Sequence, residues 1–320
     1  MQNESRRNHA TRTPALGPDR LKLVAEAQAA APHAEAPEAQ VQIPLAVRLT
    51  LARAAIQVLA DEAGADVLHI KGSAVDPSLR DVLQHGTDVD ILARPEHVAA
   101  LDRVLRAHGW RVYSSFTYGS PFEHAQTYWH ESWGYLDLHR SFPGIRADPA
   151  GAFATLARDG GTIDVAGIPC PVPGVDAQIV VLILNAARAG GVAGTPLARR
   201  WDEAGSERRA RLEALVAELD APTAFGAAFD RLDEHRAERD HDLWRVITRG
   251  GTRTEEWRAR LRAAPTRRQA LRIALRAPLV NTEKLAHDLG RSPTVRDVLR
   301  ALAARALRAG RDLVRGRVRS

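Results

Sequence analysis

The sequence predicts an α/β domain followed by a helical domain. Between residues 41 and 175, short apolar segments alternate with amphipathic ones, a pattern typical of strands alternating with helices. From residue 176 to residue 320, nearly every segment has helical spacing, interrupted by prolines and glycine pairs. Residues 1–40 are rich in Ala, Pro, Glu and Gln and lack sustained periodicity, so we expect a disordered or loosely helical arm there.

The expected elements of residues 41–175 follow from the spacing of their apolar side chains. Helical spacing between residues 44 and 63 predicts a helix, which Gly64 ends. A second, amphipathic helix is expected at residues 95–108, and a short helix or a loop before Leu83. Strands, the last two of them paired in a hairpin, are expected at residues 67–70, 88–92, 110–116, 135–139, 162–165 and 168–172.

The charge of the chain favours anionic partners. Its formal net charge is +6 and its isoelectric point is about 10.0, so its potential attracts nucleotides and nucleic acids. The basic residues are nearly all arginines, spread along the expected helices rather than interleaved with aromatic residues. Segments 258–276 and 296–319 could therefore be solvated helix faces or could bind nucleic-acid phosphates, and we favour the solvated faces.

Cysteine content and hydropathy predict a soluble, cytoplasmic protein with no membrane partner. Cys170 is the only cysteine, which excludes an intrachain disulfide and is typical of a reducing compartment. The basic N-terminus is not followed by an apolar stretch, so we expect no signal peptide. The most apolar run, residues 179–187, is too short to cross a bilayer and predicts a buried helix.

Three aspartates form the candidate site. Side chains alternate across a strand, so Asp88 and Asp90 share one face while their apolar neighbours point into the core. Asp137 and His139 alternate with leucines in the same way and could emerge beside the first pair. Such close like charges repel, and a hard divalent cation, Mg²⁺ or Mn²⁺, relieves the repulsion. Alone, however, an Asp-x-Asp pair can also simply end a strand or cap a turn.

The order of motifs resembles that of the DNA polymerase β nucleotidyltransferase superfamily. Gly72-Ser73 follows a strand and precedes the Asp88-Val89-Asp90-Ile91 strand. In that superfamily a Gly-Ser turn holds the nucleotide phosphates and the carboxylates carry metal ions. The local chemistry agrees, because glycine permits close backbone approach and free backbone amides bind phosphate.

A closer resemblance is to an uncharacterised nucleotidyltransferase-like family of bacteria, over roughly residues 65–190. The matching motifs are Lys71-Gly72-Ser73, Asp88-Val89-Asp90-Ile91-Leu92 and Asp137-Leu138-His139. The chain departs from the family at His85-Gly86, where members often carry an arginine, and in a slightly longer spacing between Gly72 and Asp88. The resemblance implies a nucleotidyltransferase fold: a small mixed sheet with flanking helices in residues 41–175, then a mostly helical domain.

The resemblance also implies an activity and a set of roles. A nucleoside monophosphate would pass from an NTP such as ATP to a hydroxyl acceptor: a small molecule, a peptide or an RNA end. Asp88, Asp90 and Asp137 would bind the metal ions, and Asp137 would help to deprotonate the acceptor. Lys71 would bind the triphosphate or would be a solvated lysine at a strand end. A silent nucleotide-binding or regulatory module of the same fold is the alternative to an enzyme.

The remaining candidates have both functional and structural readings. His124, His130 and His139 could contact the nucleotide or acceptor, or form a zinc site with an irregular spacing. Cys170, between two prolines and without an evident histidine partner, is not expected to be a nucleophile. Five aromatic residues could form a lid or stacking wall, or pack in the core: Tyr118, Phe122, Tyr128, Trp129 and Trp133.

Overall fold

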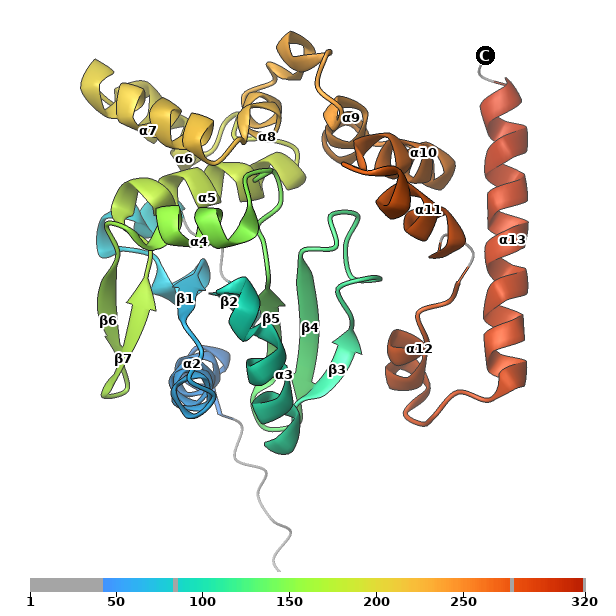
Figure 1. The fold of residues 1–320 in the computed structure, drawn as a ribbon, viewed down its shortest axis with the longest axis horizontal. Helices are drawn as coiled ribbons and strands as arrows, with labels where there is room; N and C mark the ends of the chain where they lie inside the picture. The colour runs from blue at the N-terminus through green and yellow to red at the C-terminus, as the bar shows by residue number, and fades with distance from the viewer. Residues whose placement is uncertain (1–42, 83–85, 277–278, 319–320) are drawn as a thin grey trace, which may run out of the picture. The chain divides into compact units, whose positions relative to one another are not determined.

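Five strands form one mixed sheet in the order β1-β2-β5-β4-β3 (Figure 1). The computed structural model describes residues 43–82, 86–276 and 279–318, so the arm expected at residues 1–40 lies outside the described residues. The strands β2 and β5 are parallel, and the other neighbouring pairs are antiparallel. The strands are β1 (Val67–Ile70), β2 (Asp88–Ala93), β3 (Arg111–Ser114), β4 (Ala125–His130) and β5 (Gly134–His139).

One face of the sheet is covered by two helices, α2 (Leu45–Glu62) and α3 (Val98–Ala107). Alternation along the strands sends their apolar side chains to this face, where Val89, Ile91 and Leu138 are fully buried. They share one core cluster with residues of both helices, including Ile56 and Leu101. This cluster fixes which side chains of β2 and β5 point the other way, because a slip of one residue would reverse both faces.

A buried polar network lies within this helix-covered face. The ring of His69 is fully buried between two side chains of α2. Its Nδ1 lies 3.1 Å from Nη1 of Arg53, and its Nε2 lies 2.9 Å from Oε1 of Gln57. Gln57 in turn donates to Asp61 at 2.7 Å. Burial, and then the charge of Arg53, lower the pKa of His69 to about 3, so the ring is neutral.

The opposite face packs against the second half of the chain at the β1 and β2 end. Leu68, Ile70 and Leu92 belong to a core cluster that also contains residues of the helix α5 (Val175–Arg188) and Trp244. The helix α4 (Pro149–Ala157) adds Phe153 to the same cluster. A hairpin of β6 (Gly161–Val165) and β7 (Ile168–Val172) precedes α5 and contacts β1 and α2.

The rest of the described chain is helical and confirms the expected change of character after residue 175. The elements are α6 (Pro196–Glu203), α7 (Ser206–Glu218), α8 (Pro222–Ala228), the 3₁₀ segment Leu232–His235, α9 (His241–Arg249), α10 (Arg253–Ala263), α11 (Arg267–Arg276), α12 (Thr282–Leu289) and α13 (Val295–Val318). The predicted fold class, a small mixed sheet with flanking helices followed by a helical region, is therefore confirmed.

The structure refines several predicted elements. The stretch at 125–130, for which the sequence suggested no strand, forms β4, and the strand expected at 110–116 is shorter. The helix expected at 95–108 begins with a 3₁₀ turn, Pro95–His97. Cys170 is fully buried, and burial raises the pKa of its thiol to about 11, which leaves it protonated. Within the described residues we find no helix with the length and hydropathy of a membrane span.

Candidate metal centre

A row of polar side chains crosses the sheet on the face opposite α2 and α3. Strand register pairs Asp90 with Asp137, Asp137 with Thr127, and Thr127 with Ser114. Directly paired residues of neighbouring strands project to the same face, so these four side chains form one line from β2 to β3. We call them the polar row. It shows how the alternation that buries Val89 and Leu138 also gathers the aspartates.

Asp90 is one of two buried members of the polar row, with only 6% of its surface exposed. Its Oδ1 lies 2.5 Å from Nζ of Lys71 and 2.9 Å from Nε2 of His139. Burial alone would raise the pKa of Asp90, but the charge of Lys71 and the hydrogen bond from His139 outweigh burial and lower it to about 2. Asp90 is therefore ionised throughout the physiological range.

Asp137 lies beside Asp90 and accepts a hydrogen bond from Thr127. The distance from Thr127 Oγ1 to Asp137 Oδ1 is 2.6 Å, so the hydroxyl fixes one carboxylate oxygen. One ligand atom from each of Asp90, Asp137 and His139 lies within 4.8 Å of the others. Two hard carboxylate oxygens and one imidazole nitrogen are a donor set that suits Mg²⁺ and, because of the nitrogen, especially Mn²⁺.

Asp88 shares the face of Asp90 but stands outside this three-residue group. It is half-buried at the start of β2, and its pKa is raised to about 6. Burial contributes most to that increase, followed by the negative charges of Asp90 and Asp137, whereas Lys71 opposes it. The carboxylates thus repel one another in the absence of a cation, as the sequence analysis anticipated, and a divalent ion would relieve the repulsion.

The Lys71-Gly72-Ser73 turn joins β1 to the site. Lys71 has φ 60° and ψ −179°, a conformation that residues with a side chain rarely adopt, and Gly72 follows at φ 52°. Gly72 opens a 3₁₀ turn in which Ser73 is exposed. From this turn the ammonium of Lys71 contacts Asp90, so the lysine is not the freely solvated side chain that was one of its two readings.

Two side chains that sequence reasoning missed also belong to this neighbourhood. Thr127 was overlooked because the segment around it was not assigned to a strand. Arg188 is the last residue of α5 and is half-buried. Burial lowers the pKa of Arg188, while attraction from Asp137 and Asp90 acts in the opposite direction, which places its charge near both. An arginine directly after the most apolar run of the chain, residues 179–187, was the available signal.

The three candidate histidines do not meet at one point. The rings of His124 and His139 are 5.0 Å apart and both are buried, and the Nδ1 atom of each has no hydrogen-bond partner among the described residues. His130 packs instead against Trp110, with ring centroids 5.2 Å apart. Within the described chain the structure therefore does not gather these three histidines into a zinc site, and it offers His139 alone to the carboxylates.

The aromatic residues divide between core and pocket walls. Tyr128 is fully buried in the core on the helix-covered face and donates to Asp102, so it packs in the core rather than forming a lid. Phe122 stacks on Trp244 with ring centroids 4.9 Å apart. Tyr118 lines a large pocket described below. Trp129 contacts His287 at 5.6 Å between centroids, and Trp133 lies near His130.

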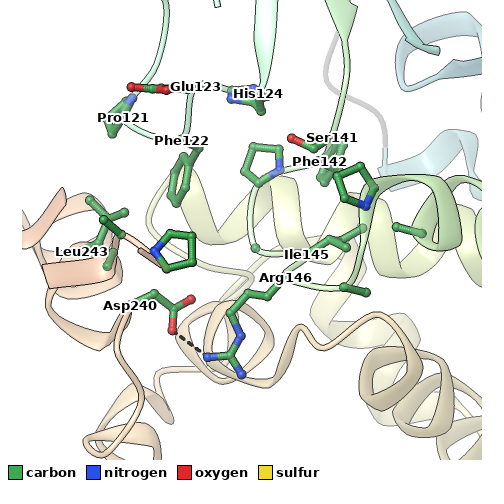
Figure 2. A pocket seen from close by; sticks show the side chains of 18 of the residues that line it. Pro121, Phe122, Glu123, His124, Ser141, Phe142, Ile145, Arg146, Asp240 and Leu243 are labelled. Atoms are coloured by element: carbon green, nitrogen blue, oxygen red, sulfur yellow. Dashed lines mark hydrogen bonds and ion pairs between the residues drawn. The ribbon is translucent and has the colours of Figure 1, made fainter. Parts of the chain in front are cut away.

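Two pockets adjoin the site. The smaller, of about 310 Å³, is lined by His124, Phe122 and Phe142, with the ion pair between Arg146 and Asp240 at its far side (Figure 2). The larger, of about 1330 Å³, includes Ser114 and Thr127 in its wall, the last two members of the polar row. A ligand in the larger pocket would therefore lie next to the hydroxyl that holds Asp137.

Comparisons with known proteins give remote similarities of fold. No protein-family model matches the chain, and no curated protein matches it. Among solved structures, it is similar to the antibiotic-resistance factor ANT(2'')-Ia, at 16% identity and a TM-score of 0.35, over 61% of this chain and 96% of that one. It is also similar to the lincosamide antibiotic adenylyltransferase LnuA with lincomycin bound, at 16% identity and a TM-score of 0.29, over 51% of this chain and 94% of that one.

Proposed function

We propose that this chain is a metal-dependent nucleotidyltransferase that moves a nucleoside monophosphate from an NTP to a hydroxyl acceptor. The observation that carries the proposal is the convergence of Asp90, Asp137 and His139 within 4.8 Å, on the sheet face opposite the helix-covered core. Asp88 adds a third carboxylate, whose pKa is raised by burial and then by the charges of Asp90 and Asp137. Mg²⁺ or Mn²⁺ would neutralise the charge of the phosphates and of the carboxylates during transfer.

The residues around the cluster have distinct roles in this proposal. Lys71 and Arg188 would bind the triphosphate, since both place a positive charge beside the carboxylates. Gly72 and Ser73 would approach its phosphates through their backbone amides. Asp137, oriented by Thr127, would accept the proton of the acceptor hydroxyl. The acceptor oxygen then bonds to the α-phosphorus, the bond to the bridging oxygen breaks, and pyrophosphate leaves with its electron pair.

Direct measurement of Mn²⁺ binding tests the proposal before any acceptor is known. We expect wild-type protein to bind Mn²⁺ in isothermal titration and in electron paramagnetic resonance, more tightly with an NTP present. Asp90→Asn and Asp137→Asn should each weaken binding by at least about tenfold, a loss typical even of residues that only orient metal ligands. Glu131→Gln is the matched control, because Glu131 is exposed in the turn between β4 and β5.

The outcomes separate three readings. Unchanged Mn²⁺ affinity in Asp90→Asn and Asp137→Asn would overturn the metal centre and the proposal with it. Binding of Mn²⁺ and NTP without pyrophosphate release, across hydroxylated small molecules, peptides and RNA ends, would instead assign a silent nucleotide-binding module. Release of pyrophosphate that depends on one acceptor class, and that both aspartate variants abolish, is the result we expect.

A further inference from the structure

The larger pocket is connected to the metal centre through the polar row. Thr127 lines the pocket and donates its hydroxyl hydrogen to Asp137, while Ser114, the next member of the row, lines the same wall. The helix α12 closes this side over β3: Asn281 donates to Ser114 Oγ at 3.0 Å, and Lys284 donates to the hydroxyl of Tyr113 at 2.6 Å. We call this cavity the β3 pocket.

The β3 pocket and the Lys71 turn lie on opposite sides of the carboxylates. The sheet order places β1, which leads into Lys71, on one side of Asp90 and Asp137, and places β4 and β3 on the other. If the triphosphate binds at the Lys71-Gly72-Ser73 turn, as proposed above, the β3 pocket lies on the other side of the carboxylates, where a second substrate could bind. In-line attack on a phosphate requires that the two substrates approach from different sides.

The walls of the β3 pocket carry a surplus of positive charge. Its basic side chains are Arg253, Arg260, Arg276, Lys284 and Arg305, against a single carboxylate, Asp288. Three of these are paired with carboxylates: Arg253 with Glu256, Arg260 with Glu123 and Glu256, and Lys284 with Asp288. Arg276, by contrast, donates to the neutral hydroxyl of Thr117 at 3.4 Å, and its positive charge helps to lower the pKa of the nearby Arg140, after the larger effect of burial.

The same walls also carry aromatic and aliphatic side chains beside their hydroxyl and amide groups. Tyr113, Tyr118 and Trp257 line the pocket together with Leu285 and Leu302. Trp257 already holds cations over its ring, with Arg260 at 4.1 Å from the centroid. The volume of about 1330 Å³ exceeds that of most small-molecule sites, which span roughly 300–1,000 Å³. The pocket can therefore hold an entire drug-sized molecule.

We propose that the β3 pocket binds the acceptor, and that the acceptor is a small molecule with a flat apolar body and an anionic carboxylate or phosphate group. This inference rests on the proposed nucleotidyltransferase function. The aromatic walls would bind the apolar body and Arg276 the anionic group, while the hydroxyl to be modified points towards Thr127 and Asp137. A cationic acceptor would be repelled by the charge of Arg276.

Three naphthalene probes with an anionic, a neutral and a cationic substituent test the proposal without metal or nucleotide. Isothermal titration would measure the affinities of 2-naphthoate, 2-naphthalenemethanol and 2-naphthylmethylamine for the full chain. We expect the carboxylate to bind at least about tenfold more tightly than the amine, with the alcohol between them. Arg276→Gln should remove about tenfold of the affinity for naphthoate and leave that for the alcohol unchanged. Arg199→Gln, exposed on α6, should change neither affinity.

The design separates this inference from the proposed function. Asp90→Asn, which tests the metal centre, should still bind naphthoate, because the carboxylate lies outside the pocket wall. If Arg276→Gln does not fold, Arg253→Gln replaces it, since Arg253 is an exposed side chain of the same wall. Equal affinities for the three probes, or a preference for the amine, would overturn the anionic acceptor. Displacement of naphthoate by NTP with Mn²⁺ would show that the pocket takes the nucleotide, and would also overturn it.

Discussion

Each face of the sheet holds one fully buried histidine, and the two histidines have different surroundings. On the helix-covered face both ring nitrogens of His69 have partners, Arg53 and Gln57. On the opposite face His139 contacts Asp90 through Nε2, while its Nδ1 has no partner among the described residues. A buried histidine with both ring nitrogens paired helps to hold a fold together, whereas one with an unpartnered nitrogen beside crowded carboxylates leaves a valence for a ligand.

This contrast predicts that replacing the histidine by leucine lowers the free energy of unfolding more on the helix-covered face than on the opposite face. His69→Leu removes the acceptor of the buried Arg53 guanidinium and one partner of Gln57, so the free energy of unfolding should fall by about 2–4 kcal/mol. His139→Leu leaves Asp90 paired with Lys71 and should cost about 1 kcal/mol or less. Urea denaturation of both variants measures the difference.

The two variants should rank in the reverse order for metal binding. His139→Leu removes a candidate ligand and should weaken Mn²⁺ binding by about tenfold, whereas His69→Leu should leave Mn²⁺ affinity close to that of the wild type. Equal losses of stability in the two variants would mean that both histidines serve mainly to hold the core together. The comparison between the faces would then fail.

The pH dependence of stability sharpens the account of the helix-covered face. The pKa of His69 is about 3 in the folded chain, against 6.5 for an unperturbed histidine. Between these values the unfolded chain binds a proton that the folded chain does not, so stability is complete above pH 6.5 and falls as the pH drops below it. The slope is at most about 1.4 kcal/mol per pH unit, which gives roughly 1–2 kcal/mol between pH 6.5 and pH 5.

The measurement is the difference in unfolding free energy between wild type and His69→Leu, taken from pH 7.5 to pH 5. Other titrating groups, including the buried His124, are common to both proteins and largely cancel. We expect the advantage of the wild type to shrink as the pH falls. A difference that is constant with pH would show that His69 is not held neutral by its burial and by Arg53.

The sequence could predict the strands β2 and β5 that carry the aspartates, but not β4 or the contacts between these elements. Alternation around Asp88, Asp90 and Asp137 is a local property of period two, and it predicts both the strands and the shared direction of these side chains. Thr127 contacts Asp137 from the neighbouring strand. Arg188 lies at the end of a helix and is separated from Asp90 by 98 positions in the sequence. Such contacts depend on tertiary packing and leave no local pattern to read.

The role of Lys71 shows the same limit at a smaller scale. Its place after a strand and before Gly72 made phosphate binding and solvation equally good readings. Neither reading contained the contact of 2.5 Å with Asp90, which depends on the side-chain conformation and on an unusual backbone at φ 60°. The ammonium thus neutralises part of the negative charge that a metal ion would otherwise neutralise. In this respect Asp90 resembles His69, whose partners are also side chains of the protein.

Lys71→Met tests whether the lysine competes with a metal ion for Asp90, and its expected effect is small. If the ammonium competes with the cation for Asp90, its removal should raise Mn²⁺ affinity in the absence of nucleotide by up to about tenfold, roughly 1.4 kcal/mol. NTP affinity should fall in the same variant, because a charge that would bind phosphate is lost. Lys284→Met is the matched control, since that lysine pairs with Asp288 and Tyr113 instead.

The direction of the change in Mn²⁺ affinity decides what kind of network Lys71 belongs to. A rise means that a cation displaces the lysine from Asp90, and that the sheet face with the polar row can bind a ligand. A fall means that Lys71 orients Asp90 as Arg53 and Gln57 orient His69. In that case the contrast between the two histidines does not extend to function, and Lys71 belongs to the metal centre as a residue that positions Asp90.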